Sequence, residues 1–236
     1  MIEPRPAATV VLVRPDGKGG FEILLTRRPQ EMRFLGGYYV FPGGTVQRDD
    51  YSPQALERCR GLTPADARRI LDSSQRPEEA LGHWVAVVRE LFEEVGILLC
   101  VDESGSDIEL SYEVNKQDLE KKRQAIVKRK IDFGSFLASQ NLFCDLSRLA
   151  YLDHWVTPDI YSMRFDTRFY IAILPNSQTP LPSSEEVTHS VWLNPGDALA
   201  QIDRRDFPIL PPTTTVLQEL GRFSSWERLR AKFNLH

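Results

Sequence analysis

The chain has 236 residues, of which 42% are hydrophobic and 26% are charged, and its formal net charge at pH 7 is −4. This composition is typical of a globular protein with a full core, and the acidic balance excludes a general nucleic-acid-binding protein, which needs a basic surface. No apolar run reaches the roughly 18 residues that suggest a membrane-spanning helix. We therefore expect no nucleic-acid partner and no membrane partner.

The N-terminal residues 1–6 lack the basic start and long apolar segment of a secretion signal, so we expect a cytoplasmic location. The three cysteines, Cys59, Cys100 and Cys144, are far apart in the sequence and have no metal-site spacing. This pattern favours reduced structural thiols. The sequence does not specify the oligomeric state, so a homodimer stays open.

Two short apolar segments, residues 7–13 and 21–26, flank a glycine-rich turn at residues 17–20 and predict a β-hairpin. Arg28 follows the second segment and Arg33 comes five residues later. Arginine can bind phosphate through two parallel hydrogen bonds, which makes phosphate binding our hypothesis for both. The competing interpretation is that Arg28 ends an edge strand in water.

Gly37 and the Phe-Pro-Gly-Gly turn at residues 41–44 lie between these arginines and a region with two helix starts. Glycine lets the backbone approach a ligand closely. Downstream, Ser52-Pro53 and Thr63-Pro64 each place a capping hydroxyl before a proline, the pattern of a helix N-terminus. We expect two short helices there, leading into a longer one.

The longer helix is predicted over residues 81–95, where apolar side chains form one stripe about 120° wide at 100° per residue. Glu90, Glu93 and Glu94 lie on the opposite side, and their carboxylates repel one another. A divalent cation removes this repulsion, and carboxylate oxygens suit Mg²⁺ or Mn²⁺. An ordinary solvated acidic face is the competing interpretation. Gly96 is expected to end the helix, and His83, on the same side as Glu90, is expected at the surface or in a cap.

Further elements are expected along the second half of the chain. Residues 164–170 alternate charged and apolar side chains, so Arg164, Asp166 and Arg168 share one face; ion pairing and substrate binding are equally open there. The predicted elements are a strand at 97–101, a solvated basic helix at 115–130, a helix at 131–140, paired strands at 149–156 and 165–174, a strand at 187–193, and helices beginning at 194–197 and covering 223–233.

The run Arg89-Glu90-x-x-Glu93-Glu94-x-Gly96-Ile97 resembles the second half of the Nudix box at every defined position, and Gly43-Gly44 resembles its opening. Nudix hydrolases cleave a nucleoside diphosphate linked to another moiety. The resemblance implies an α/β/α sandwich around a mixed sheet. It also implies that Glu90, Glu93 and Glu94, with the Gly43 carbonyl, hold Mg²⁺ or Mn²⁺. Glu93 and Glu94 are then the expected catalytic acids, and Arg89 orients a carboxylate such as Glu93.

The segment from Leu24 to Gly44 resembles a signature of the coenzyme A pyrophosphatase branch of this family. The matching positions are Leu24, Leu25, Thr26, Arg28, Arg33, Gly37 and residues 41–44, and Pro29 is the one departure. The resemblance implies that coenzyme A or an acyl derivative is cut to 3′,5′-ADP and a 4′-phosphopantetheine. Arg28, Arg33, Gly37 and Gly44 are then the expected substrate-binding residues.

The box is interrupted, because residues 51–88 stand where the family motif has seven residues. We expect a single domain over residues 1–236, with a helical insertion at 51–80, a helical elaboration at 112–145 and extra C-terminal helices. Asp50 stands near the place of a box glutamate, but the insertion leaves its role open.

The general base of Nudix enzymes often lies outside the box, and Glu185 and Glu186 are candidates. Hydrolysis of ADP-ribose or of a dinucleotide competes with the coenzyme A hypothesis. A non-catalytic binding module of the same fold is a further hypothesis. Such modules usually lose the box acids, which are present here.

Overall fold

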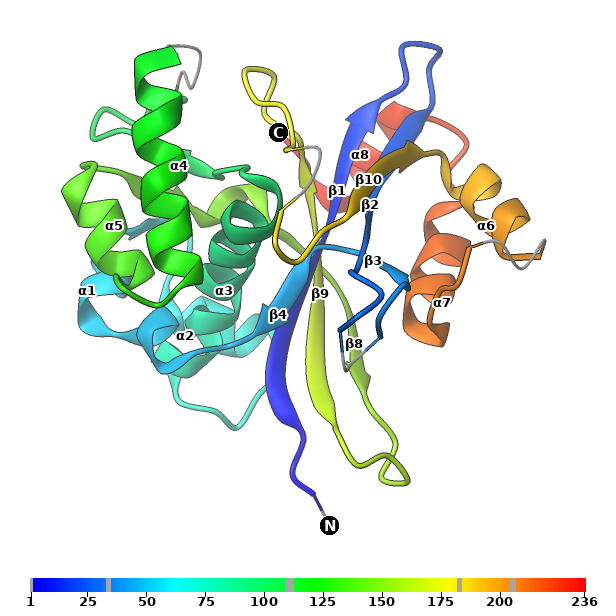
Figure 1. The fold of residues 1–236 in the computed structure, drawn as a ribbon, viewed down its shortest axis with the longest axis horizontal. Helices are drawn as coiled ribbons and strands as arrows, with labels where there is room; N and C mark the ends of the chain where they lie inside the picture. Colours follow the sequence, from blue (N-terminus) through cyan, green and yellow to red (C-terminus); the bar gives the residue numbers. More distant parts are fainter. Residues whose placement is uncertain (1, 33–34, 109–112, 182–183, 204–206) are drawn as a thin grey trace.

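The computed structural model describes residues 2–32, 35–108, 113–181, 184–203 and 207–236. Its main β-sheet consists of β1 (Arg5–Pro15), β2 (Phe21–Arg27), β3 (Tyr39–Val40), β4 (Gly43–Thr45), β8 (Ala150–Val156), β9 (Phe165–Ile173) and β10 (His189–Leu193). The strand order is β10-β2-β1-β9-β8, with β3 beside β2 and β4 beside β1 (Figure 1). β1 pairs in parallel with β9 and antiparallel with β2 and β4, so the sheet is mixed, as predicted.

A smaller three-stranded sheet and the helices complete the described structure. The small sheet contains β5 (Cys59–Arg60), β7 (Phe143–Asp145) and β6 (Cys100–Val101), in that order. The helices are α1 (Pro53–Leu56), α2 (Pro64–Ile70), α3 (Pro77–Val95), α4 (Glu113–Val127), α5 (Phe133–Ser139), α6 (Pro195–Asp203), α7 (Pro211–Leu220) and α8 (Trp226–Phe233), with 3₁₀ turns η1 (Arg48–Tyr51) and η2 (Leu146–Arg148).

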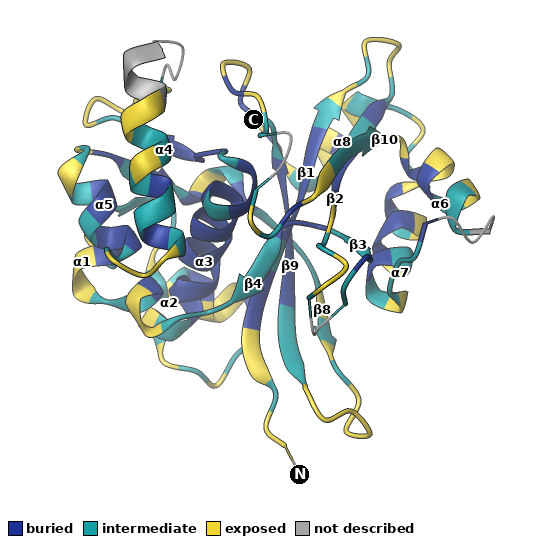
Figure 2. Ribbon diagram, in the orientation of Figure 1, coloured by how far each residue is buried: buried dark blue, intermediate teal, exposed yellow. Residues whose placement is uncertain are grey.

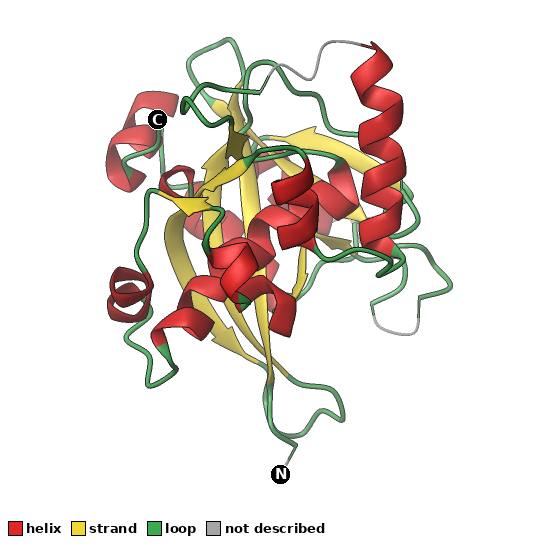
Figure 3. Cartoon of the chain, turned by 90° about the vertical axis from the view of Figure 1, so that its left-hand side faces the viewer, coloured by secondary structure: helices red, strands yellow, loops and turns green. Residues whose placement is uncertain are grey.

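The central strand β1 is buried on both faces, and its side chains alternate between two cores. Val10 and Leu12 pack with residues of α1 to α5, whereas Val11 and Val13 pack with residues of α6, α7 and α8. Successive side chains of a strand point to opposite faces, so the sheet separates two helical layers. Figure 3 shows one of these layers in front of the strands. The predicted α/β/α sandwich is confirmed.

Helix α3 is buried along most of its length (Figure 2). It runs from Pro77 to Val95 and is followed by Gly96, which adopts the left-handed conformation expected of a terminating glycine, with φ 73°. The expectation that His83 lies at the surface is wrong, because this helix is covered on several sides and His83 is 1% exposed. Burial, with the charge of Arg168 nearby, lowers the pKa of His83 to about 4.

The segment inserted before α3 is folded against the same core. Ser52 and Thr63 cap α1 and α2, as predicted, by accepting hydrogen bonds from the backbone N–H groups of Ala55 and Asp66. Ala55 is fully buried in the cluster that contains α3. Residues 51–80 are therefore packed structure, while the division into one domain stays a prediction.

The strand predicted at residues 97–101 is largely wrong, because only Cys100–Val101 forms a strand. The side chain of Gln178 takes the place of a strand partner at Leu98. Its Oε1 accepts from Leu98 N at 2.8 Å, and its Nε2 donates to Leu98 O at 2.8 Å. The backbone groups are satisfied without a ladder, which is the requirement for burying them.

The three cysteines occupy neighbouring positions in the small sheet. Cys59 pairs with Cys144 across β5 and β7, and Cys144 pairs with Cys100 across β7 and β6. All three are free, as predicted, although their separation in the sequence gave no sign of this proximity.

The remaining expected elements are present with shifted ends. The hairpin of β1 and β2 and the pairing of β8 with β9 are confirmed. The basic helix is α4, which ends at Val127; residue 112, where the elaboration was predicted to begin, lies outside the described residues. The last helix begins at Trp226, after its Ser225 cap.

The charged face of β9 contains ion pairs and backbone contacts. Asp166 contacts His154 at 2.6 Å and Arg168 Nε at 3.5 Å, and Arg164 donates to the carbonyls of Thr157 and Ile2. Of the two roles left open by the sequence, this arrangement supports ion pairing. Among the described residues, no helix is long and apolar enough to cross a membrane.

The end of α3 generates a prediction about stability. Gly96 and Gly105 both have positive φ, but only a Cβ at Gly96 would meet another side chain, at 2.9 Å from Leu181. Gly105→Ala is expected to lower the free energy of unfolding by about 1 kcal/mol, through backbone strain alone. Gly96→Ala should cost roughly 2–3 kcal/mol because overpacking adds to the strain. Urea unfolding of both variants checks this; equal losses would contradict the contact with Leu181.

Candidate active site

The last two turns of α3 place three glutamates beneath the glycine-containing strand β4. Glu90 and Glu94 are 8% and 3% exposed. A Cβ at Gly44 would lie 2.4 Å from Glu90 Oε1, and a Cβ at Gly43 would lie 2.4 Å from the Ala8 carbonyl oxygen. Both glycines are therefore required by close packing: Gly43 against β1 and Gly44 against the Glu90 carboxylate.

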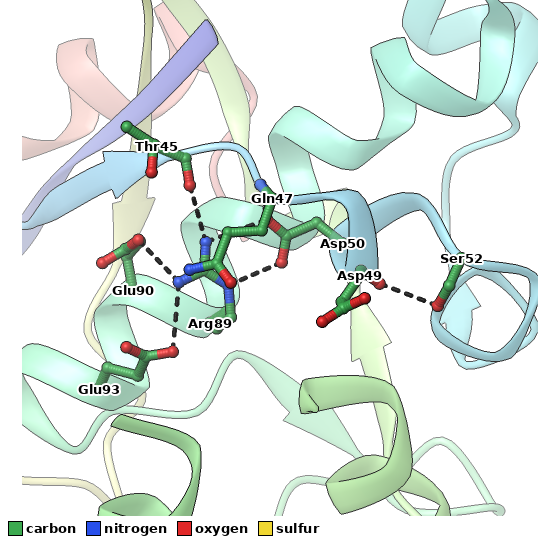
Figure 4. A network of polar contacts seen from close by, with 8 residues as sticks. All are labelled: Thr45, Gln47, Asp49, Asp50, Ser52, Arg89, Glu90 and Glu93. Carbon is green, nitrogen blue, oxygen red and sulfur yellow. Dashed lines mark hydrogen bonds and ion pairs between the residues drawn. The ribbon is translucent and has the colours of Figure 1, made fainter. Parts of the chain in front are cut away.

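Arg89 is the centre of a buried network beside these glutamates (Figure 4). Its Nε and Nη2 donate to the two carboxylate oxygens of Asp50, at 2.7 and 3.0 Å. Nη2 also donates to the Thr45 carbonyl at 2.9 Å, and Nη1 donates to Glu90 at 2.7 Å and Glu93 at 3.2 Å. These five contacts match the five N–H donors of a guanidinium group. The structure thus places Arg89 against Glu93, the carboxylate suggested by the resemblance, and also against Glu90.

Asp50 is fully buried and serves as the counterion of Arg89. Gln47 N donates to its Oδ2 at 2.7 Å, which fixes the carboxylate within η1. The open question about its role therefore has a geometric answer: Asp50 faces Arg89 and contacts the box glutamates through it. Sequence reasoning could not find this pair, because the inserted helices separate the two residues along the chain.

Burial dominates the electrostatics of the three glutamates. It raises the pKa of Glu90 to about 7, against the opposing charge of Arg89, and it raises the pKa of Glu93. Burial raises the pKa of Glu94 well above its usual range, and the negative charges of Glu90 and Glu186 add to this effect. Clustered carboxylates of this kind release protons readily only when positive charge is supplied.

The chemistry of these side chains suits a hard divalent cation. Carboxylate oxygens are the donors that Mg²⁺ and Mn²⁺ prefer, and Arg89 contacts only the Oε1 atoms of Glu90 and Glu93. Glu94 Oε2 accepts a longer bond, 3.4 Å, from Gly43 N. Within the described part of the chain, no group of three or more histidine, cysteine or acidic side chains is already arranged as a metal site.

Arg28 directly follows β2, and its charge partly opposes the rise that burial causes in the pKa of the Glu94 carboxyl. Its Nε is buried and has no hydrogen-bond partner among the described residues. Gly37, with φ 78°, is held next to this arginine, because Gly37 N donates to the Arg28 carbonyl at 3.1 Å. Arg33 lies outside the described residues.

A small cavity adjoins the last turn of α3, with a volume of about 10 Å³. Its lining residues are Glu93, Arg123, Gln124, Val127, Ser184, Glu185 and Glu186. Of the two candidates for the general base, Glu186 acts electrostatically on Glu93 and Glu94, whereas Glu185 lies 3.7 Å from Lys128. Sequence reasoning missed Arg123 and Ser184. Arg123 stands in a run of charged residues, and Ser184 carries no local signal.

Several known proteins are similar to this chain in sequence. A family model described as the NUDT19 Nudix domain matches residues 4–222. The acyl-coenzyme A diphosphatase NUDT19 of Xenopus laevis is 28% identical over 233 residues, covering 86% of this chain. The human protein of that name is 24% identical over 250 residues, covering 94% of this chain. The chain spans 60% of the Xenopus protein's length and 66% of the human protein's.

A solved structure has a similar fold along nearly the whole chain. The crystal structure of a NUDIX hydrolase from Alicyclobacillus acidocaldarius is 28% identical, with a TM-score of 0.77. The match covers 98% of this chain and 97% of that one.

The Arg89–Asp50 pair generates a second prediction. Asp50→Asn removes the bidentate carboxylate from a buried guanidinium and leaves it only Glu90 and Glu93 as acidic partners, so it should lower the free energy of unfolding by about 3 kcal/mol. The neighbouring Asp49 is exposed, and Asp49→Asn should change stability by less than about 0.5 kcal/mol. Denaturant unfolding of the two variants measures the difference. If Asp50→Asn were as stable as Asp49→Asn, the network would not contribute to folding.

Proposed function

The chain belongs to the NUDT19 Nudix domain family, and from this we propose that it is a metal-dependent hydrolase of coenzyme A or acyl-coenzyme A. The products would be 3′,5′-ADP and 4′-phosphopantetheine or its acyl derivative. The observation that carries the proposal is the juxtaposition of opposite charges at one place. Glu94, a buried acid of α3, lies within reach of the charge of Arg28, whose guanidinium has a buried nitrogen without a partner among the described residues.

Glu90, Glu93 and Glu94 would hold Mg²⁺ or Mn²⁺, with the Gly43 carbonyl as a further oxygen. When bound, such an ion supplies charge neutralisation at the diphosphate and lowers the pKa of a water molecule. The protein holds the acids in place: Arg89 contacts Glu90 and Glu93, and β4 approaches Glu90 through Gly44. Glu93 and Glu94 are therefore proposed as catalytic carboxylates, and Arg89 orients Glu93 together with Glu90.

Glu186 is proposed as the residue that accepts a proton from the attacking water. It lines the small cavity with Glu93, and a cavity of about 10 Å³ has room for about one water molecule. Glu185 lines the same cavity but faces Lys128 as well. Glu186 is thus the better placed of the two.

Arg28 is proposed to bind a phosphate of the substrate. Gly37 is proposed to shape the loop that follows Arg28, and Gly44 to let the backbone approach the substrate closely. Arg33 is proposed to assist it on the strength of the sequence alone. Coenzyme A combines a 3′-phosphate with a diphosphate, so it presents more negative charge than ADP-ribose. The relatives named acyl-coenzyme A diphosphatase support this choice of substrate.

The experiment that tests the proposal is a substrate panel with Mg²⁺ or Mn²⁺. Coenzyme A, acyl-coenzyme A esters of several chain lengths, ADP-ribose and a dinucleoside polyphosphate are incubated with the protein, and the products are identified by mass. We expect 3′,5′-ADP from the coenzyme A compounds. A faster reaction with ADP-ribose or the dinucleotide would overturn the substrate class, and no hydrolysis of any compound would favour a binding module.

The role of the carboxylates gives a third prediction. Glu94→Gln preserves the shape of the side chain but removes its charge, so turnover should fall at least about a hundredfold. Glu78→Gln is a matched control, because Glu78 lies exposed in the first turn of the same helix. Its turnover should equal that of the unmodified protein. Full metal-dependent activity in Glu94→Gln would remove Glu94 from the site.

The role of Arg28 gives a fourth prediction. Losing one charge-assisted contact costs about 1.5–3 kcal/mol, so Arg28→Ala should raise KM for coenzyme A roughly ten- to a hundredfold. Hydrolysis of ADP-ribose should be harmed less. Arg14→Ala is the control, because Arg14 already pairs with Glu22 on the neighbouring strand β2. Equal losses on both substrates in Arg28→Ala would contradict a role in selecting coenzyme A.

A further inference from the structure

Helix α4 is charged and largely solvated, but it contains one buried arginine. Arg123 is 4% exposed, and burying a guanidinium costs several kcal/mol unless its donors are paired. Glu120, one turn earlier, accepts from Nε at 2.8 Å and from Nη2 at 2.7 Å. This bidentate contact holds the guanidinium in one orientation, and Nη1 is left to point away from α4.

The remaining nitrogen reaches the end of the carboxylate helix. Arg123 Nη1 donates to the backbone carbonyl of Glu93, on α3. The last carbonyls of a helix have no partner within it, and a cation is favourable near that end. Different partners satisfy adjacent carbonyls: Gly96 N donates to Phe92 O at 3.0 Å, and Leu181 N donates to Val95 O at 2.9 Å. Arg123 therefore caps the turn that carries Glu93 and Glu94.

Arg123 also lines the small cavity that Glu93 and Glu186 share. We infer that Arg123 is a positioning residue: from α4 it holds the last turn of α3, and with it Glu93, where the proposed metal-binding face needs them. This inference rests on the proposed function, because it assigns the purpose of the contact to that same face. It also assigns a role in the active site to the helical elaboration, which the sequence presents as a solvated surface.

The expected effect is on the carboxylates and not on substrate recognition. Residues that orient metal ligands typically affect metal affinity by about ten- to a hundredfold when they are replaced. Arg123→Met keeps much of the side chain's length but removes every donor. It should weaken Mn²⁺ binding and lower kcat by about tenfold or more, while KM for coenzyme A changes less than about twofold, because Arg28 is untouched.

Arg148→Met is a matched control. Arg148 pairs with Asp145 through Nε at 2.9 Å, across the same three-residue spacing, and also with Asp107. Its partners lie on the small sheet and the loop beside it. Arg148→Met should lower stability while leaving Mn²⁺ affinity and kcat within about twofold of the unmodified protein. Arg123→Lys, which keeps the charge and one donor direction, should recover part of the loss.

The experiment measures Mn²⁺ binding by electron paramagnetic resonance of the free ion, alongside kcat and KM for coenzyme A. Weaker Mn²⁺ binding in Arg123→Met, recovered in part by Arg123→Lys and absent from Arg148→Met, supports the inference. Unchanged Mn²⁺ binding in Arg123→Met overturns it, as do equal losses in Arg148→Met, which would show general destabilisation.

Two further outcomes separate this inference from the proposed function. If the unmodified protein binds Mn²⁺ but does not cleave coenzyme A, the substrate proposal fails. The Mn²⁺-binding measurements on the variants then still decide the role of Arg123. If it binds no Mn²⁺, the proposal that Glu90, Glu93 and Glu94 hold a metal ion fails, and this inference fails with it. Should Arg123→Met not fold, Glu120→Gln decides instead: it frees Arg123 from its bidentate partner, and unchanged Mn²⁺ affinity in that variant overturns the inference.

Discussion

The structure around the candidate site depends on one buried guanidinium. Arg89 joins Asp50 of η1, the Thr45 carbonyl of β4 and two acids of α3, so a single side chain fixes three segments relative to one another. A charge this deeply buried is stable only when its donors are paired, and here all of them are. The glutamates that face it are held by the same contacts, so the stability of the core and the placement of the acids are coupled.

The inserted segment also contributes to the site, although it carries none of the three glutamates. The insertion separates Asp50 from α3 in the sequence, yet its helices pack into the core beside α3 and bring η1 back to Arg89. Helix α4 contributes in a comparable way, because Arg123 contacts the turn that bears Glu93. Helix α3 is thus held by the inserted segment and by α4, and neither belongs to the family's short motif.

The family and the fold class were recognisable from local patterns, and the family match and the sandwich confirm them. The three glutamates fall within two turns of one helix, so helical geometry alone places them on one side. The caps at Ser52 and Thr63 and the end at Gly96 were also correct, since a cap involves only neighbouring residues. The strand at 97–101 and the exposed His83 were wrong, because distant residues determined both: Gln178 replaces a strand partner, and the packing around α3 buries the histidine.

The sequence by itself therefore determined most of the helices, the glycine turn and the grouping of the acids, because hydrophobic periodicity, capping and spacing act over a few residues. Only the tertiary structure decided which residues hold those acids. Asp50 and Arg89 are 39 positions apart, and Arg123 is 30 positions from the carbonyl that it contacts. Cys59, Cys100 and Cys144 likewise become neighbours only when β7 pairs with β5 and β6. Such contacts depend on the path of the chain and on burial, and neither is encoded in local spacing.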